Sequence, residues 1–163
     1  ESLGIAGREQ TNGIKRFEAN FPIFYKLAKE AGHKFPEITA AQVMLETSNG
    51  ADPSAVNNFL GLKATTSETE RGESTLQNTT ENEGDKVISI QDNFKNFESL
   101  PDMMSQYKTE WNDDFMGRKG IVNVNTAEEA AKLLQANVYA TDPDYATKLM
   151  QIIKDAKRNP PLF

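Results

Sequence analysis

The sequence contains no cysteine and a single histidine, His33, among its 163 residues. Without thiols it cannot form disulfides or use a cysteine nucleophile, and one histidine leaves too few ligands for a typical zinc site. We therefore expect neither a metal nor another cofactor. A Ser/His/Asp triad would need His33, but this residue follows Gly32 at an expected helix end, where a solvated position is favoured.

Long apolar runs and basic clusters are also missing. No stretch approaches the roughly 18 apolar residues of a membrane-spanning helix, so no membrane span is expected. The net charge is −6, and lysine and arginine form no block that could neutralise a phosphate backbone, which argues against nucleic acid as a partner. The 37% hydrophobic and 26% charged residues are typical of a folded globular chain.

The length predicts one domain with a sizeable core. Residues 1–13 carry glycines and polar residues without periodicity, and we interpret them as an arm or linker before a domain that covers residues 14–163. The sequence begins with Glu1 and has no basic-then-apolar leader. We therefore expect a processed product or a fragment of a longer chain that carries other domains.

Two helices are predicted in the first third of the chain. Asn20 is a candidate N-cap and Gly32 a candidate C-cap for the first. The second begins at Pro36 and follows helical spacing of apolar residues until Gly50. Glu46 therefore lies in the last turn of an otherwise apolar helix.

The following region changes in composition, because residues 65–85 are rich in Thr, Ser and Glu and nearly lack large apolar residues. Two interpretations remain, a disordered loop or a solvent-exposed β-hairpin. The β-prone segment VISI after a Glu-Gly-Asp turn favours the hairpin, which would form a small, mobile β lobe over about residues 65–97.

Helical signals return after this lobe. Ser99 starts a helix that runs to about Trp111, Thr126 starts a second with a capping-box pattern, and a third follows Asp142. A mainly helical body interrupted by one small β lobe is an α+β fold.

Glu46 is the first candidate for chemistry. A carboxyl group directly after an apolar triad on a buried helix would be desolvated, and desolvation raises its pKa. Such an acid can protonate a glycosidic oxygen. Spacing alone favours the simpler alternative, a glutamate at a helix end that faces solvent.

Three ordered segments resemble glycoside hydrolase family seventy-three. They are ITAAQVMLETSNG, then NNFLGLKA at residues 57–64, and YATDPDYATKLMQII at residues 139–153. The family contains endo-β-N-acetylglucosaminidases, among them flagellar-rod peptidoglycan hydrolases and listerial autolysins. The resemblance implies a lysozyme-like fold with the β lobe over the active-site cleft. It also implies cleavage of peptidoglycan between N-acetylglucosamine and N-acetylmuramic acid.

The resemblance also implies roles for individual residues. Glu46 in LETSNG matches the catalytic acid of the family. The family places a second acidic residue in the β lobe after a Thr-Thr pair and before an aromatic segment. Glu81 matches that position ahead of Phe94, with Glu83 as the alternative.

Four further residues match positions beside the family's cleft. Tyr139 is expected to contact substrate, and Tyr145 to lie in the core or behind the cleft. Asn57 and Asn58 match an Asn-Asn pair whose amides line the groove, although Asn58 also fits a helix-ending residue. The chain departs from the family at Asn49, where an aromatic residue is common.

The expected partner is therefore the glycan strand of peptidoglycan, and the expected location is extracytoplasmic: secreted, periplasmic, wall-associated or in a phage virion. Two rival functions remain open. A lytic transglycosylase shares the fold but leaves an anhydro-sugar, and a non-catalytic wall-binding or virion structural module would fit the missing aromatic at Asn49.

Overall fold

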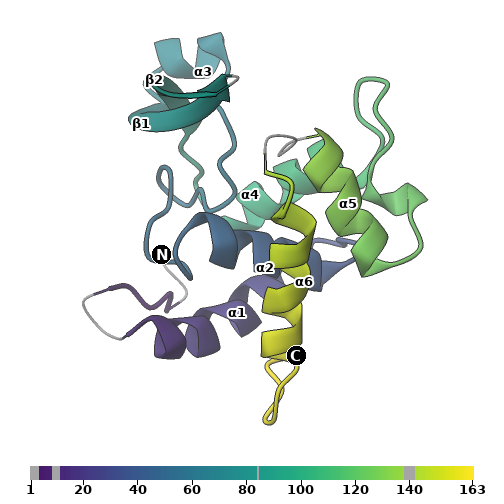
Figure 1. Ribbon diagram of the computed structural model, residues 1–163. Coiled ribbons are helices and arrows are strands. Elements are labelled where there is room, and N and C mark those ends of the chain that lie inside the picture. Colours follow the sequence, from purple (N-terminus) through teal and green to yellow (C-terminus); the bar gives the residue numbers. More distant parts are fainter. Residues whose placement is uncertain (1–3, 9–11, 84, 138–141) are drawn as a thin grey trace.

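The computed structural model describes residues 4–8, 12–83, 85–137 and 142–163. Helices form the body, and a two-stranded antiparallel hairpin stands apart from it as a lobe (Figure 1). This arrangement confirms the α+β prediction. Within the described ranges, no helix combines the length and apolar character needed to cross a bilayer.

The first helix, α1 (Gly13–Glu30), begins eight residues earlier than predicted. Asn12 is its N-cap, because its side chain accepts a hydrogen bond from the backbone of Lys15 at 2.9 Å. The prediction that Asn20 caps the helix was wrong, since Asn20 is fully buried inside α1. Asn20 has the residue type of an N-cap, but its burial inside the helix gives it a different role.

Asn20 ties three segments together. Its Oδ1 accepts from the backbone N–H of Ala6 at 2.8 Å, and its Nδ2 donates to the carbonyls of Ala6 at 2.9 Å and Asn49 at 2.8 Å. Asn49 and Gly50 have positive φ angles of 62° and 97°, and a Cβ on Gly50 would come within 2.5 Å of Asn20 Nδ2. The described part of the N-terminal arm therefore packs on the body and helps to fix the loop that follows α2.

The second helix, α2 (Pro36–Glu46), packs against α1 and matches the predicted start. The β lobe contains a short helix, α3 (Thr66–Glu70), followed by β1 (Ser74–Glu83) and β2 (Lys86–Lys95). The hairpin prediction is confirmed, but α3 was missed. A capping box between Thr65 and Glu68 starts it, and this Thr-x-x-Glu pattern is readable in the sequence.

The predicted later helices are confirmed. The remaining elements are α4 (Leu100–Tyr107), a π-helical turn (Lys108–Asn112), a 3-10 turn (Ile121–Asn123), α5 (Ala127–Asn137) and α6 (Tyr145–Ala156). Ser99 caps α4 through the backbone of Asp102 at 3.2 Å, and Thr126 caps α5 through Glu129 at 3.1 Å. Short polar caps before apolar stripes therefore located these helices from sequence alone.

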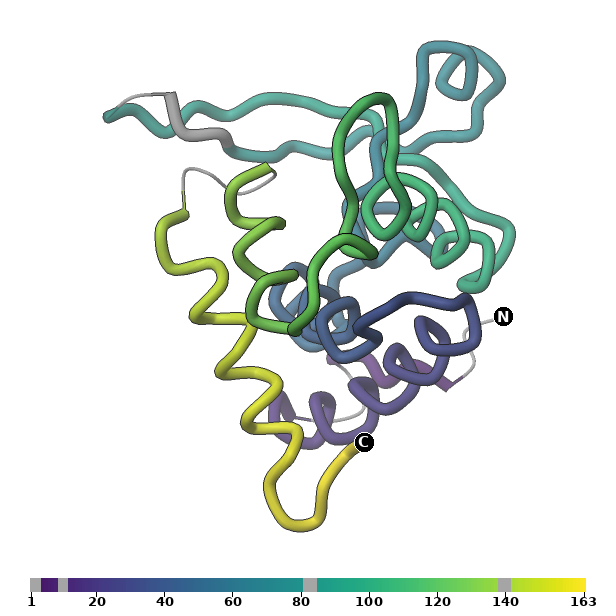
Figure 2. Tube along the Cα trace, turned by 90° about the vertical axis from the view of Figure 1, so that its right-hand side faces the viewer, coloured from purple at the N-terminus to yellow at the C-terminus, as the bar shows by residue number. Residues whose placement is uncertain are grey.

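The core lies where α1, α2, α4, α5 and α6 converge, and the hairpin projects across one end of this bundle (Figure 2). Side chains with no exposed surface come from each helix and include Phe21, Phe24, Ile38, Val43, Met103, Leu134 and Leu149. The described part of the β1–β2 hairpin contributes no residue to this cluster. The side chains of the two strands are therefore not part of the core of the body.

His33 lies in this core, so the prediction of a solvated position was wrong. Its Nε2 is 2.9 Å from the carbonyl oxygen of Met104, and its Nδ1 is 2.8 Å from Thr39 Oγ1. Because a carbonyl only accepts, Nε2 carries the proton and Nδ1 accepts from the threonine hydroxyl. The ring also stacks on Tyr107, with centroids 5.9 Å apart. Both nitrogens are occupied, which gives His33 a structural role.

Burial lowers the pKa of His33 from its usual 6.5, because desolvation outweighs the hydrogen bond to Met104. The folded state therefore binds a proton less readily than the unfolded state, and His33 makes the fold less stable as pH falls below 6.5. Since the chain has one histidine, its imidazole proton signals are unambiguous in an NMR titration. We expect a midpoint below 6.5, and a midpoint at or above this value would contradict the buried neutral ring.

Candidate active site

Glu46 is the last residue of α2, and its side chain is exposed. The expectation that this carboxyl group would be desolvated is therefore wrong. The residues before it, including Val43 and Met44, are buried, so the helix is anchored in the core while its end reaches the surface. The fold therefore presents Glu46 to a ligand on a rigid support.

Lys148 of α6 is a neighbour of Glu46 that sequence analysis missed. The pKa of Lys148 is raised, first by a hydrogen bond and charge interaction with Asp142, and to a smaller extent by the negative charges of Asp144 and Glu46. Lys148 Nζ lies 2.9 Å from Asp142 Oδ2. The packing of α2 against α6 creates this proximity, which no local pattern encodes.

A cavity of about 490 Å³ lies between the loop that follows α2 and the first strand of the hairpin. The hydrogen bond from Gln77 Nε2 to the carbonyl of Ser54 (3.1 Å) spans these two walls. The lining residues are Ala51, Asp52, Pro53, Ser54, Gln77, Asn78, Thr79 and Phe94. They are mostly polar and small, so they can form hydrogen bonds with the hydroxyl groups of a sugar, and of them only Phe94 was named from the sequence.

Glu81 and Glu83 both lie in β1, in the outer half of the hairpin. Their backbone partners in β2 are Ile88 and Lys86, respectively. The structure therefore places both candidates for the second carboxylate on the strand that borders the cavity. Tyr139 lies outside the described residues.

Tyr145 is the first residue of α6 and is buried. Its hydroxyl accepts a hydrogen bond from Gln42 Nε2 at 3.2 Å, while Gln42 Oε1 accepts from the hydroxyl of Tyr107. Of the two positions expected for Tyr145, the structure supports the one in the core. Gln42 precedes Glu46 by one helical turn, and its polar side chain in an apolar helix was the signal for this buried network.

Asn58 is fully buried, and all of its side-chain hydrogen-bonding capacity is used within the protein. Its Nδ2 donates to the carbonyls of Leu62 at 2.8 Å and Lys95 at 2.9 Å. Its Oδ1 accepts from the backbone N–H of Leu60 at 3.4 Å and Leu62 at 3.1 Å. Asn58 therefore joins the base of the lobe to the body from within, while the half-buried Asn57 donates to the carbonyl of Phe97 at 3.1 Å.

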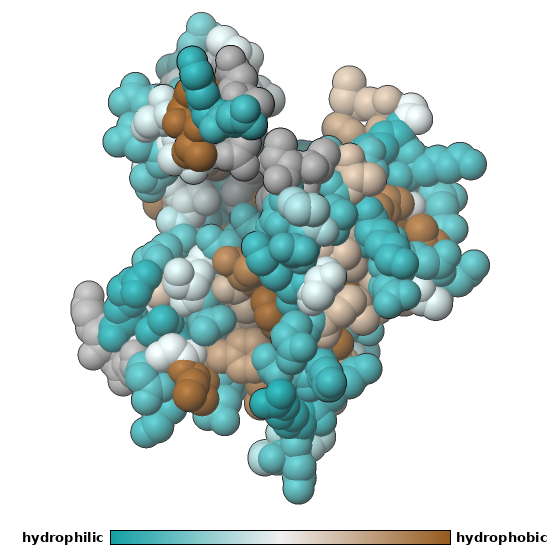
Figure 3. Space-filling view, viewed as in Figure 1, coloured by the Kyte–Doolittle hydropathy of each residue, from teal (hydrophilic) through white to brown (hydrophobic). Residues whose placement is uncertain are grey.

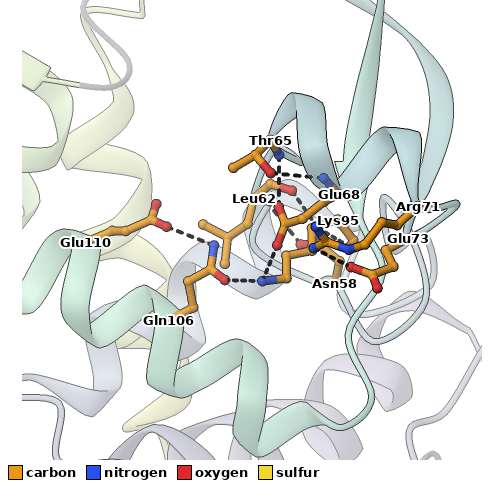
Figure 4. Close-up of polar contacts among 9 residues, drawn as sticks. All are labelled: Asn58, Leu62, Thr65, Glu68, Arg71, Glu73, Lys95, Gln106 and Glu110. Atoms are coloured by element: carbon orange, nitrogen blue, oxygen red, sulfur yellow. Dashed lines mark hydrogen bonds and ion pairs between the residues drawn. The ribbon is translucent and has the colours of Figure 1, made fainter.

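A second polar cluster holds the lobe to α4 (Figure 4). The Lys95 ammonium group lies 2.7 Å from Glu68 Oε2 and donates to Gln106 Oε1 at 2.8 Å, and Gln106 in turn donates to Glu110 at 2.8 Å. The hydrogen bond from Lys95, followed by that from the backbone of Thr65, lowers the pKa of Glu68. These polar contacts attach the base of the lobe to α4, beside the core residues Leu62 and Phe97 that flank the lobe.

Comparison with known proteins supports a glycosidase family. The family model for glucosaminidase, described as mannosyl-glycoprotein endo-beta-N-acetylglucosaminidase, matches residues 21–158. Exo-glucosaminidase LytG of Bacillus subtilis is 34% identical over 133 residues, which cover 77% of this chain and 45% of LytG. Peptidoglycan hydrolase FlgJ of Salmonella typhimurium is 30% identical over 155 residues, which cover 88% of this chain and 46% of FlgJ. The chain thus spans less than half the length of either relative.

Solved structures agree with this match. A C-terminally truncated glycoside hydrolase domain of FlgJ from Salmonella typhimurium superimposes with a TM-score of 0.60 at 28% identity, covering 90% of this chain and 98% of that domain. The catalytic domain of the autolysin Auto from Listeria monocytogenes shares the fold, with a TM-score of 0.61 at 23% identity over 93% of this chain and 88% of that one. These neighbours confirm the lysozyme-like fold, and the family match over most of the chain shows that this protein belongs to the glucosaminidase family.

Proposed function

We propose that this domain is a glycoside hydrolase that cuts peptidoglycan between N-acetylglucosamine and N-acetylmuramic acid. Its family supports this proposal, as do the names of its relatives, an exo-glucosaminidase and a peptidoglycan hydrolase. The substrate lies outside the cytoplasmic membrane, so the domain would act in an extracytoplasmic location. Binding would depend on local polar contacts, because a net charge of −6 gives no long-range attraction to an anionic wall.

The position of Glu46 carries the proposal. Its carboxyl group is exposed at the end of a helix whose buried residues anchor it in the core. The loop that follows leads within a few residues to the cavity that β1 closes. A glycan seated against this loop and β1 would bring a glycosidic oxygen near an acid on a rigid support, which general acid catalysis requires.

Glu46 would protonate the leaving oxygen as the bond to the anomeric carbon breaks. Glu81, with Glu83 as the alternative, would act from the hairpin. Carboxyl groups about 5 to 5.5 Å apart suit a nucleophile, and a separation of about 6.5 to 9.5 Å leaves room for an activated water. At a still wider separation the acetamido group of the substrate would attack instead, with the second carboxylate stabilising it electrostatically.

Digestion of purified sacculi tests the proposal. The new chain ends are reduced with borohydride and identified by mass spectrometry. We expect N-acetylglucosamine at the new reducing ends, whereas an anhydro-muramic acid product would identify a lytic transglycosylase. Binding to sacculi without any new ends would identify a wall-binding module, and either of these results would overturn the proposal.

A further inference from the structure

A second cavity, of about 510 Å³, lies between the start of α1, the end of α6 and the C-terminal tail. Asn49, in the loop that follows Glu46, also lines it. Figure 3 shows apolar side chains gathering in the hollow between these helices, below the lobe. We propose that this cavity is a subsite for the peptide stem that N-acetylmuramic acid carries, an inference that rests on the proposed function.

One face of α6 leads from the neighbourhood of α2, which ends at Glu46, to this cavity. α6 packs against α2, and on α6 Lys148, Ile152 and Asp155 follow one another along one face at helical spacing. With a rise of about 1.5 Å per residue, these two positions lie about 6 and 10 Å along the helix from Lys148. Ile152 and Asp155 both line the cavity. A substituent on a sugar beside Glu46 could reach this distance.

The loop after α2 forms the other connection. Asn49 lines the cavity three residues after Glu46. Its Nδ2 donates to the carbonyl of Gly13 at 3.1 Å, and its own carbonyl accepts from Asn20 at 2.8 Å. Hydrogen bonds therefore hold this wall of the cavity in place, which reduces the entropy lost when a ligand binds.

The lining has the chemistry of a short peptide rather than of a sugar. Ile14, with 74% of its surface exposed, and the half-buried Leu162 supply apolar area for alanyl methyl groups. Arg158 pairs with Asp155 at 3.0 Å but keeps 70% of its side chain exposed, so its guanidinium can also bind a peptide carboxylate. The carboxylates of Glu18 and Asp155 suit the amino group of a diamino acid. Alanyl, glutamyl and diamino-acid residues make up such a stem.

The test compares two substrates, peptide-bearing sacculi and glycan strands stripped of peptide by an amidase. Arg158→Ala and Ile14→Ser should keep their rate on stripped strands and lose about tenfold in kcat/KM on peptide-bearing sacculi, as for the loss of one charge-assisted hydrogen bond or one apolar contact. The matched controls are Lys132→Ala and Met116→Ser, which should change neither rate. The side chain of Lys132 is 69% exposed and forms an ion pair on the surface of α5, and Met116 is 89% exposed.

Direct binding separates this inference from the proposed function. An N-acetylmuramyl-tripeptide should bind the wild-type domain in an NMR titration with shifts at Ile14 and Ile152, and Arg158→Ala should weaken it about tenfold. N-acetylmuramic acid without peptide should cause no shift there. If the tripeptide leaves these signals unchanged, or if Arg158→Ala slows both substrates equally, the subsite is overturned. If the wild-type domain cleaves neither substrate, the proposed function fails while the titration still decides the subsite.

Discussion

Replacing Glu46 with Gln should lower the rate of glycan cleavage at least about a hundredfold, because the amide cannot donate the proton that the leaving oxygen needs. The fold should be unaffected, since the side chain is exposed and the substitution keeps its shape. The measurement is the rate at which each protein releases reducing ends from purified sacculi. The amount of each protein bound to the sacculi and its melting temperature are measured alongside. Retained binding with lost cleavage is the signature of a missing general acid.

Glu37→Gln is the matched control, because Glu37 lies in the first turn of the same helix, at the end away from Glu46. It should keep the wild-type rate. Unchanged lysis by Glu46→Gln would instead favour a binding module and remove Glu46 from the chemistry.

The same assay compares the two carboxylates of β1. Glu81→Gln should reduce the rate more than Glu83→Gln if Glu81 is the second carboxylate, and the reverse order would assign that role to Glu83. Equal, small effects of both would point to attack by the substrate's own acetamido group, with Glu46 as the main catalytic group.

Replacing Asn58 with Ala should lower the free energy of unfolding by about 3 to 5 kcal/mol. The substitution removes two donated and two accepted hydrogen bonds and leaves the buried carbonyls of Leu62 and Lys95 without this partner. Urea denaturation measures the loss. Since these bonds join the base of the lobe to the body, cleavage should also decline at temperatures where the variant remains folded.

Asn57→Gly provides the contrast. Asn57 has a φ angle of 54°, which glycine adopts without strain, and its side chain makes one hydrogen bond, to the carbonyl of Phe97. We expect a loss of about 1 kcal/mol for this substitution. Comparable losses for the two variants would contradict the structural role assigned to Asn58.

Local signals in the sequence predicted much of the helical body. Ser99 and Thr126 are caps followed by apolar stripes, and both start helices where expected. The resemblance to a known family directed attention to Glu46, whose position at the end of an apolar helix the structure bears out. The Thr-x-x-Glu signal that starts α3 is also present in the sequence. It was missed because residues 65–85 were interpreted from their overall composition.

Buried polar residues could not be located in this way. Three polar residues of types that are common on protein surfaces are buried here: Asn20, His33 and Asn58. Each can be buried because partners from distant segments satisfy its hydrogen bonds. Composition and spacing contain no information about those partners. The same limit applies to the cavity beside β1, whose walls are two segments with no shared pattern.

The sequence by itself determined that the chain has no thiol chemistry, where the helices after Ser99 and Thr126 begin, and that Glu46 lies at a helix end, because residue types, caps and apolar spacing are local properties. The tertiary structure alone decided that Glu46 is exposed near Lys148, that Asn58 is a buried junction, and that a second cavity borders the Glu46 loop. These features depend on helix packing and on hydrogen bonds between segments far apart in the chain, which form only once the core has folded.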